Sequence, residues 1–174
     1  DVFREIEAFL NETGSPIASI SVLNAPLNTA LHERMKQEGR IREDFKGFWH
    51  FTTNIIPKQM TIEELYDGHQ NLFKRLYEPE KFEFRLKKWL QNVKYLTPLY
   101  STRKKDFFRI FMIMKILWHF TFCVPPNTRR TFFSIMKSAW QINPRLISRA
   151  VSIMLQYWHY YHFSHATPWH NRER

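Results

Sequence analysis

Residues 61–77, TIEELYDGHQNLFKRLY, decide the fold class of this chain. Thr61 is followed three residues later by Glu64, which is the spacing of a capping box at a helix N-terminus. Apolar and aromatic side chains then recur at intervals of three and four residues, at Ile62, Leu65, Tyr66, His69, Leu72, Phe73 and Leu76. This pattern predicts an amphipathic helix with one face in a core.

Downstream of this helix, the same spacing predicts four more helices. They are expected at about 80–96, 103–122, 128–141 and 145–163, with Pro98, Pro125-Pro126 and Asn143-Pro144 as breaks. Residues 61–164 are therefore expected to form a bundle of about five helices.

Upstream, the pattern is that of an α/β protein. Residues 2–10 have helical spacing and end before Gly14, and residues 30–38 follow Asn28 or Thr29 as the cap and stop at Gly39. Between them, residues 16–23 (PIASISVL) form a short, nearly uncharged run typical of a strand buried on both faces. One strand makes no sheet, so this segment is expected to need strands from elsewhere.

The charge is unevenly distributed along the chain. Of 174 residues, 26 are Lys or Arg and 16 are Asp or Glu, a formal charge of +10. Residues 103–174 hold 12 basic residues, 2 acidic ones (Asp106 and Glu173) and 15 of the 29 aromatic ones. Such a cationic, aromatic surface can lie on an anionic membrane, bind nucleic acid, or be the solvated face of a bundle, with nucleic acid the least favoured.

The most apolar predicted helix, 103–122, is not expected to span a membrane. At 100° per residue its polar side chains Lys104, Lys105, Arg109, Lys115 and His119 fall within a sector of about 140°. Because charge is costly at the centre of a bilayer, the apolar side of this helix is expected to lie against a core or an interface.

Metal and nucleophile chemistry has little support in the residues. Cys123 is the single cysteine, so the chain cannot supply a cysteine-ligated cluster, and its apolar surroundings predict a buried, inert thiol. His159 and His162, one helical turn apart, are weak metal candidates, with His165 and His170 near them in sequence. An aromatic helix end is the favoured interpretation, so no metal site and no catalytic residue is predicted.

Three segments, in the same order along the chain, resemble cobalamin-binding radical S-adenosylmethionine (SAM) proteins. Residues 54–77, NIIPKQMTIEELYDGHQNLFKRLY, are similar to the start of the accessory domain that follows the catalytic barrel in a subset that includes enzymes of hopanoid biosynthesis. Residues 17–40 resemble the last strand and helix of that barrel, with Asn28 where the usual turn has Gly; Asn tolerates a left-handed conformation. The Pro144-Arg-Leu start and Tyr161-His-Phe finish resemble the end of the accessory domain.

The resemblance implies a mostly α fold, in which a helix-strand-helix remnant of a radical SAM α/β barrel precedes the bundle. It places the end of the barrel at 1–40, an irregular linker at 41–60, the accessory domain at 61–164 and a flexible tail at 165–174. The parent polypeptide, with an N-terminal barrel and a cobalamin-binding module, is expected to use a 4Fe-4S cluster, S-adenosylmethionine and cobalamin. This chain lacks the three cluster cysteines, so it is expected to bind none of them alone.

The function implied is to cover the barrel and shape the site for an apolar substrate in a methyltransferase-like or related enzyme. Asn24, Asn54 and Pro57 are the substrate-proximal candidates, and His162 is a structural polar anchor. Asn24 follows the predicted strand, whose carboxyl end would face a barrel active site. The alternative is a non-enzymatic peripheral membrane or scaffold module with a cationic helical face. The expected location is the cytoplasm, with the inner face of the membrane as a peripheral site.

Overall fold

The computed structural model describes residues 2–45, 51–93 and 106–165, and these residues are mostly helical, as predicted. The elements in order are α1 (Val2–Thr13), α2 (Ala30–Gln37), α3 (Ile62–Leu76), α4 (Pro79–Asn92), α5 (Asp106–Trp118), a π-helical turn (His119–Cys123), α6 (Pro126–Ile142), a 3-10 turn (Pro144–Leu146) and α7 (Ile147–His165). The predicted helices match these elements to within a few residues at most ends.

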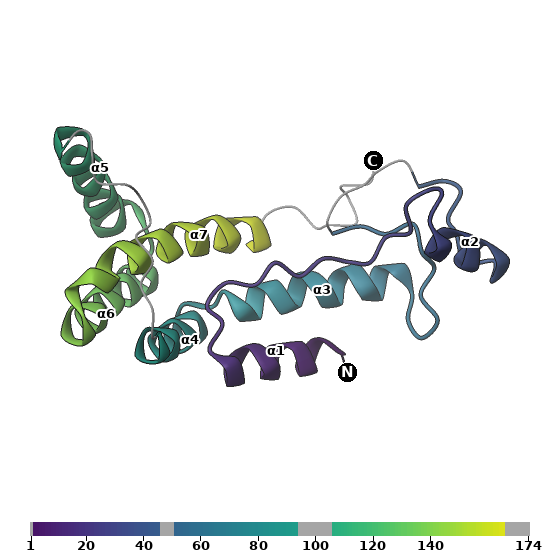
Figure 1. Cartoon of the computed structure of the whole chain (residues 1–174), viewed down its shortest axis with the longest axis horizontal. Helices are drawn as coiled ribbons and strands as arrows, with labels where there is room; N and C mark the ends of the chain where they lie inside the picture. Colours follow the sequence, from purple (N-terminus) through teal and green to yellow (C-terminus); the bar gives the residue numbers. More distant parts are fainter. Residues whose placement is uncertain (1, 46–50, 94–105, 166–174) are drawn as a thin grey trace.

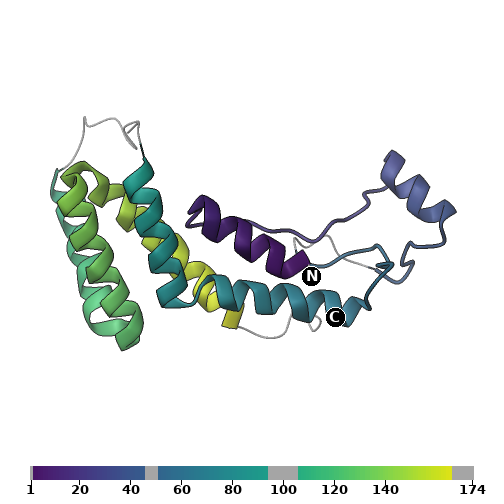
Figure 2. The ribbon, with the colours of Figure 1, turned by 90° about the horizontal axis from the view of Figure 1, so that it is seen from below.

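The helices form an elongated arrangement with the core toward one end (Figures 1 and 2). α1 and α7 both pack along α3, and α4 packs on α6. Stacked rings fill the junction of α3, α4, α6 and α7: the ring centroids of Phe82 and Tyr157 lie 4.2 Å apart, and those of Phe120 and Phe132 lie 4.4 Å apart. α2 lies at the opposite end of the molecule with the loops around it (Figure 1).

The local signals around the helix ends are confirmed. The Thr61 N–H donates to Glu64 Oε2 at 2.8 Å and the Glu64 N–H donates to Thr61 Oγ1 at 3.1 Å, so the capping box is closed. Thr29 caps α2 by accepting from the His32 N–H. The backbone φ of Asn28 is 64°, so this residue takes the left-handed conformation that asparagine tolerates.

Gly68 of α3, which has no side chain, lets α1 approach α3 closely. A Cβ at Gly68 would overlap the ring of Phe3, so only glycine permits this contact. The close approach brings Glu7 of α1 to Arg75 of α3, where Arg75 Nε donates to Glu7 Oε2 at 2.7 Å.

The strand predicted at residues 16–23 is not formed within the described residues. The segment has no ladder partner there and runs beside α3 as an extended strip (Figure 1). The expectation of burial on both faces is also wrong, because Leu23 is 65% exposed and Ile17 and Ile20 are half-buried. Side chains of α3, described below, take the place of a neighbouring strand on one edge.

In the cationic half, the core placement of the helix predicted at 103–122 and the burial predicted for Cys123 are wrong. The apolar side chains of α5 from Phe111 to Trp118 are exposed except for half-buried Ile116, because little besides the π-helical turn contacts this helix. Cys123 at the end of that turn is exposed, and Trp140 points outward from α6 with 63% of its surface exposed. Lys104, Lys105, the side chain of Arg109 and His170 lie outside the described residues.

No helix in the described ranges is long and apolar enough to cross a membrane. The α5 helix has 13 residues, and α7, the longest at 19, carries polar side chains along its length. The predicted absence of a spanning segment in 103–122 is consistent with this finding.

Arg85 of α4 joins the C-terminal ends of two helices, α1 and α3, inside the core. Its side chain is buried, and its guanidinium donates to the carbonyls of Ser15 (3.2 Å) and Leu76 and to Asn11 Oδ1 (3.3 Å). Desolvation by burial lowers the pKa of Arg85. Its electrostatic interactions with Tyr77 and with the Glu7 carboxylate oppose that shift. The guanidinium thus satisfies carbonyls at the ends of α1 and α3 that would otherwise be buried without a donor.

Replacing Arg85 by Met is expected to lower the free energy of unfolding by about 3 kcal/mol, because the acceptors of Ser15 and Leu76 lose their donor. Urea denaturation followed by circular dichroism measures this change. Arg34→Met on the exposed surface of α2 is the matched control and is expected to cost less than about 0.5 kcal/mol. Equal losses in the two variants would contradict the role of Arg85.

Candidate functional site

Asn24 and Asn54, predicted from the sequence as neighbours of a substrate, are brought together by four hydrogen bonds. The Ala25 N–H donates to Asn54 Oδ1 at 2.8 Å, and Asn54 Nδ2 donates back to the Ala25 carbonyl at 2.7 Å. Asn24 Nδ2 donates to the Thr52 carbonyl at 2.8 Å, and the Asn54 N–H donates to Asn24 Oδ1 at 3.2 Å. We call this reciprocal set the asparagine clamp.

The clamp works as a substitute for strand pairing. Each asparagine amide has the same donor and acceptor geometry as a peptide group, so it can satisfy both polar groups of a facing residue. Asn54 does this for Ala25, which is fully buried, and is itself only 7% exposed. The clamp therefore fixes two irregular segments, 24–25 and 52–54, against each other in a place where unpaired backbone groups would be costly.

Thr53 and Tyr66 tie the clamp to α3. Thr53 Oγ1 donates to the Leu23 carbonyl at 2.6 Å and accepts from the Ile55 N–H at 3.0 Å. The Thr53 N–H donates to the hydroxyl of Tyr66, buried on α3, at 2.9 Å. The position of both loops is thus set by the first turns of α3.

A third segment joins through the isolated antiparallel bridge between Ile41 and Ile55. The Arg42 N–H donates to the Asn54 carbonyl and the Ile56 N–H donates to the Arg40 carbonyl, both at 2.9 Å. Arg42 also donates through its guanidinium to the Thr53 carbonyl at 3.2 Å. The clamp is consequently the centre of a small hydrogen-bonded platform.

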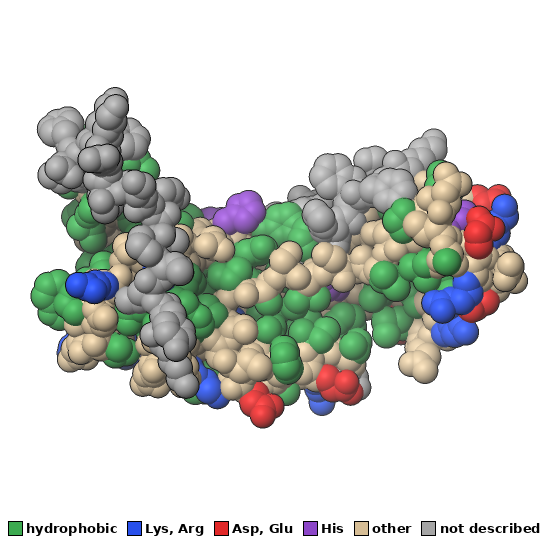
Figure 3. Space-filling model, in the orientation of Figure 1, with side chains coloured by type: hydrophobic (Ala, Val, Ile, Leu, Met, Phe, Trp, Pro, Cys, Tyr) green, Lys and Arg blue, Asp and Glu red, His purple; other side chains and the backbone are tan. Residues whose placement is uncertain are grey.

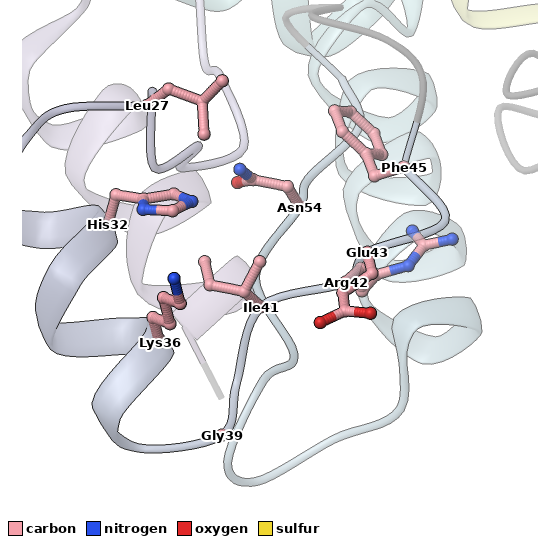
Figure 4. Close-up of a pocket in the computed structure, with 9 residues that line it drawn as sticks. All are labelled: Leu27, His32, Lys36, Gly39, Ile41, Arg42, Glu43, Phe45 and Asn54. Carbon is pink, nitrogen blue, oxygen red and sulfur yellow. The ribbon is translucent and has the colours of Figure 1, made fainter.

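A pocket of about 580 Å³ opens beside this platform, between α2 and residues 41–45 (Figure 4). Its lining residues are Leu27, His32, Lys36, Gly39, Ile41, Arg42, Glu43, Phe45 and Asn54. His32 and Lys36, one turn apart on α2, face the pocket from one side, and Arg42 and Glu43 border the other (Figure 4). Figure 3 shows acidic and basic side chains gathered at this end of the molecule.

The pocket is lined by both apolar and ionic side chains. Its apolar walls are Leu27, Ile41 and Phe45, and the guanidinium carbon of Arg42 lies 5.7 Å from the ring centroid of Phe45. The side-chain amide of Asn54 bonds to both backbone groups of Ala25, so Asn54 shapes the wall through the clamp. The lining therefore sets three apolar side chains beside five polar ones, and a ligand in it meets both kinds of group.

The other predicted site residues lie elsewhere. Pro57 is half-buried and belongs to neither the clamp nor the pocket lining. His162 is exposed on α7, with its ring edge-on to Trp158 at 4.1 Å between centroids. A polar link between α3 and the end of α7 is made by Gln70, whose Nε2 donates to the Ser164 carbonyl at 3.2 Å. The roles of Pro57 and His162 stay predictions.

Among the described residues, no three His, Cys, Asp or Glu side chains converge on a possible metal position. His159 and His162 are both exposed on α7, and His159 stacks on Phe163 with the centroids 6.3 Å apart. His165 is nearby on the same helix, but its Nδ1 contacts the Tyr161 carbonyl at 2.8 Å.

Two polar side chains of α3 were not predicted as functional residues and hold the segment that leads into the clamp. Tyr77, at the C-cap of α3, pairs with both backbone groups of Ala18: its hydroxyl accepts from the Ala18 N–H at 3.3 Å and donates to the Ala18 carbonyl at 3.2 Å. His69 Nε2 lies 3.0 Å from the Ile20 carbonyl, which can only accept, so this nitrogen carries the proton. Their position on the apolar side of the predicted helix was the sequence feature from which burial of these two polar side chains could have been predicted.

Burial controls the titration of both groups. Desolvation raises the pKa of Tyr77 to about 12, against the opposing hydrogen bond to Ala18. Desolvation lowers the pKa of His69 to about 4, against the hydrogen bond to Ile20. Both side chains are therefore neutral at pH 7, which is the state that suits a polar contact inside a core.

Comparisons with known proteins place the chain in a family. A family model described as a domain of unknown function, DUF4070, matches residues 29–171. The chain belongs to this family. The DUF4070 match includes α2, the pocket residues from His32 onward and all the later helices, and it begins after Asn24, Leu27 and the segment beside α3.

One relative gives a further indication. The chain is 33% identical over 79 residues to a protein of Synechocystis named an uncharacterized methyltransferase. The match covers 44% of this chain and 15% of that protein, so this DUF4070 chain spans only a small part of the relative's length. No solved structure matches.

His69 predicts a pH dependence of stability. Because the folded pKa is about 4 and the ordinary value is 6.5, stability is full above pH 6.5 and is lost as the pH falls toward 4. Urea denaturation is expected to show a loss of about 2 kcal/mol from this group between pH 7 and pH 5.

His69→Gln keeps a donor for Ile20 and removes the titrating ring, so it is expected to abolish that part of the loss. His159→Gln on the exposed side of α7 is the control and should leave the pH dependence unchanged. A pH dependence that is the same in His69→Gln and in the native chain would show that His69 is not the source.

Proposed function

We propose that this chain is the accessory domain, with the adjoining end of the barrel, of a cobalamin-dependent radical SAM enzyme of the methyltransferase type. In this proposal it covers the open end of the barrel and shapes the site for an apolar substrate. Two observations outside the structure support this proposal. They are the order of the three resembling segments along the chain and the similarity to a protein named a methyltransferase. The short share of that relative's length fits a domain that works as part of a longer protein.

The observation that carries the proposal is the unequal use of the two edges of residues 16–23. On one edge the backbone groups of alternate residues are bonded: Ala18 to Tyr77, Ile20 to His69, and Val22 through its carbonyl to Asn24 Nδ2 at 3.4 Å. An extended chain directs the polar groups of successive residues to opposite edges.

The other edge belongs to Ile17, Ser19 and Ser21. Within the described part of the chain, the backbone groups of these three residues make no hydrogen bond. A β-branched, uncharged segment with one edge open is suited to pair with a strand that another part of the protein supplies. The barrel of the parent enzyme is the strand source in this proposal.

The clamp then places the pocket at the end of that strand. Asn24 follows the strand, and ligands of α/β barrels bind at the carboxyl ends of the strands. The asparagine clamp fixes the chain at this point, so the pocket walls from 27 to 45 are held next to the expected active site. Apolar Leu27, Ile41 and Phe45 give that wall the character that an apolar substrate requires.

The cofactors of the parent belong to its other parts in this proposal. A chain with one cysteine, exposed at position 123, cannot supply the three thiolates of a 4Fe-4S cluster. S-adenosylmethionine and cobalamin are likewise assigned to the barrel and to the cobalamin-binding module. The expected sequence signature is a C-x₃-C-x₂-C motif upstream of Asp1 in the same polypeptide.

Asn54→Ala in the complete enzyme is expected to lower turnover at least tenfold, because the clamp no longer fixes the pocket wall against the strand end. Turnover is measured together with iron and cobalamin content, which should not change. Asn92→Ala is the matched control, since this exposed asparagine donates to the Lys88 carbonyl one turn away on α4, far from the clamp in sequence. Unchanged turnover in Asn54→Ala would count against the proposed role of the clamp.

A further inference from the structure

The α5 end of the molecule presents a large apolar surface to solvent. Six side chains between Phe111 and Trp118 are from 42% to 63% exposed, and Phe122 in the π-helical turn is 70% exposed. They lie on several sides of the helix, with Lys115 as the polar exception in 111–118. Figure 1 shows α5 standing away from α6 and α7. An exposed apolar surface of this extent is typical of a contact site for a protein or a membrane.

The length of α5 narrows what can cover it. Apolar helices of 10 to 14 residues are typical of buried core helices and of helices that lie in a membrane interface. α5 has 13 residues, and its described side chains, from Phe111 to Trp118, are exposed apart from half-buried Ile116, which favours the second type. Exposed Trp118, 61% accessible, is of the residue type that is enriched at that depth.

A groove extends the apolar surface beyond α5. It has a volume of about 670 Å³ and lies between α5, α6 and the first turns of α7. Ile113 and Leu117 form its α5 side, Phe132 and Met136 its α6 side, and Arg145 is at its edge. The continuous apolar area therefore reaches across three helices and carries a cation at its border.

The charge on this surface has one sign. From Phe111 to His165 the sequence contains no Asp or Glu, while Lys115 and Arg145 are exposed beside the apolar residues. Lys115 Nζ lies 4.9 Å from the ring centroid of Phe111, so its charge is held close to the apolar face.

Asp106, the first residue of α5, lies outside the side chains that the structure describes, and Glu83 of α4 faces a different side of the molecule. Glu83 of α4 contacts Thr131 and Ser134, which lie across α6 from the groove residues Phe132 and Met136. Glu83 is also paired there with Lys87 at 2.6 Å. The groove lining consequently contains Arg145 and no acidic side chain, and the described side chains of α5, from Phe111 to Trp118, contain Lys115 and no acidic one.

We propose that α5 and the adjoining groove dock on an anionic lipid bilayer surface. α5 lies in the interface with its apolar side chains among the acyl chains, and Lys115 and Arg145 contact the anionic headgroups. A second copy of the chain fits this surface poorly, because a symmetric contact would set cations against cations. The inference does not depend on the proposed enzymatic function.

The test is co-sedimentation of the purified full chain with phosphatidylcholine vesicles, with and without 25% phosphatidylglycerol as the anionic probe lipid. Binding is expected to the anionic vesicles and to weaken as salt rises. The double substitution Trp118→Ser with Phe122→Ser is expected to weaken binding at least tenfold. Phe9→Ser, at a 62% exposed site on α1, is the matched control and should bind as the native chain does.

A second variant separates charge from apolar contact. Lys115→Glu is expected to weaken binding to anionic vesicles at least threefold and to leave binding to neutral vesicles unchanged, while Arg34→Glu, at an exposed position of α2, changes neither. The proposal is overturned by an absence of vesicle binding, or by binding that survives both α5 variants. It is also overturned if the Trp118 and Phe122 substitutions abolish a dimer, measured by light scattering, in a chain that ignores vesicles.

Discussion

The structure depends on the way α3 holds an extended backbone that has no neighbouring strand in the described part of the chain. Residues 16–25 are largely apolar, so they lie along a core helix, yet their peptide groups need polar partners once they leave water. Tyr77, His69 and Tyr66, spaced along the inner stripe of α3, provide these partners directly or through Thr53. α3 therefore packs in the core and also supplies the hydrogen-bond partners that a neighbouring strand would otherwise supply.

This constraint connects the core with the candidate site. The Tyr77 end of α3 is fixed by Arg85, which also holds the end of α1, and the Tyr66 end is fixed to the asparagine clamp. A displacement of α3 would thus move the clamp and the pocket wall beside it. Packing in the bundle and geometry at the loops are coupled through a rigid helix, which is a physical reason for the two to occur in one domain.

The sequence predicted what depends on local rules and missed what depends on distant partners. The Thr61 capping box and the turn at Asn28 are local, so both could be predicted from spacing and residue type. The sequence predicted that Asn24 and Asn54 both lie near a substrate. It did not predict that they bond to each other, since no local pattern specifies a contact between residues 30 positions apart. The exposure of α5 and Cys123 was missed because a periodic pattern indicates which face is apolar, while the elements that cover it are a tertiary property.

Amide hydrogen exchange at Ser19 and Ser21 is the most direct test of the central proposal, in which residues 16–23 are held by α3 along one edge and pair with a barrel strand of the parent enzyme along the other. Exchange is compared between the 174-residue chain alone and the complete enzyme. The account predicts that both amides become protected in the complete enzyme, while the Ala18 amide, bonded to Tyr77, and the Leu72 amide in α3 are protected in both. Equal exchange of Ser19 and Ser21 in the two samples would contradict it.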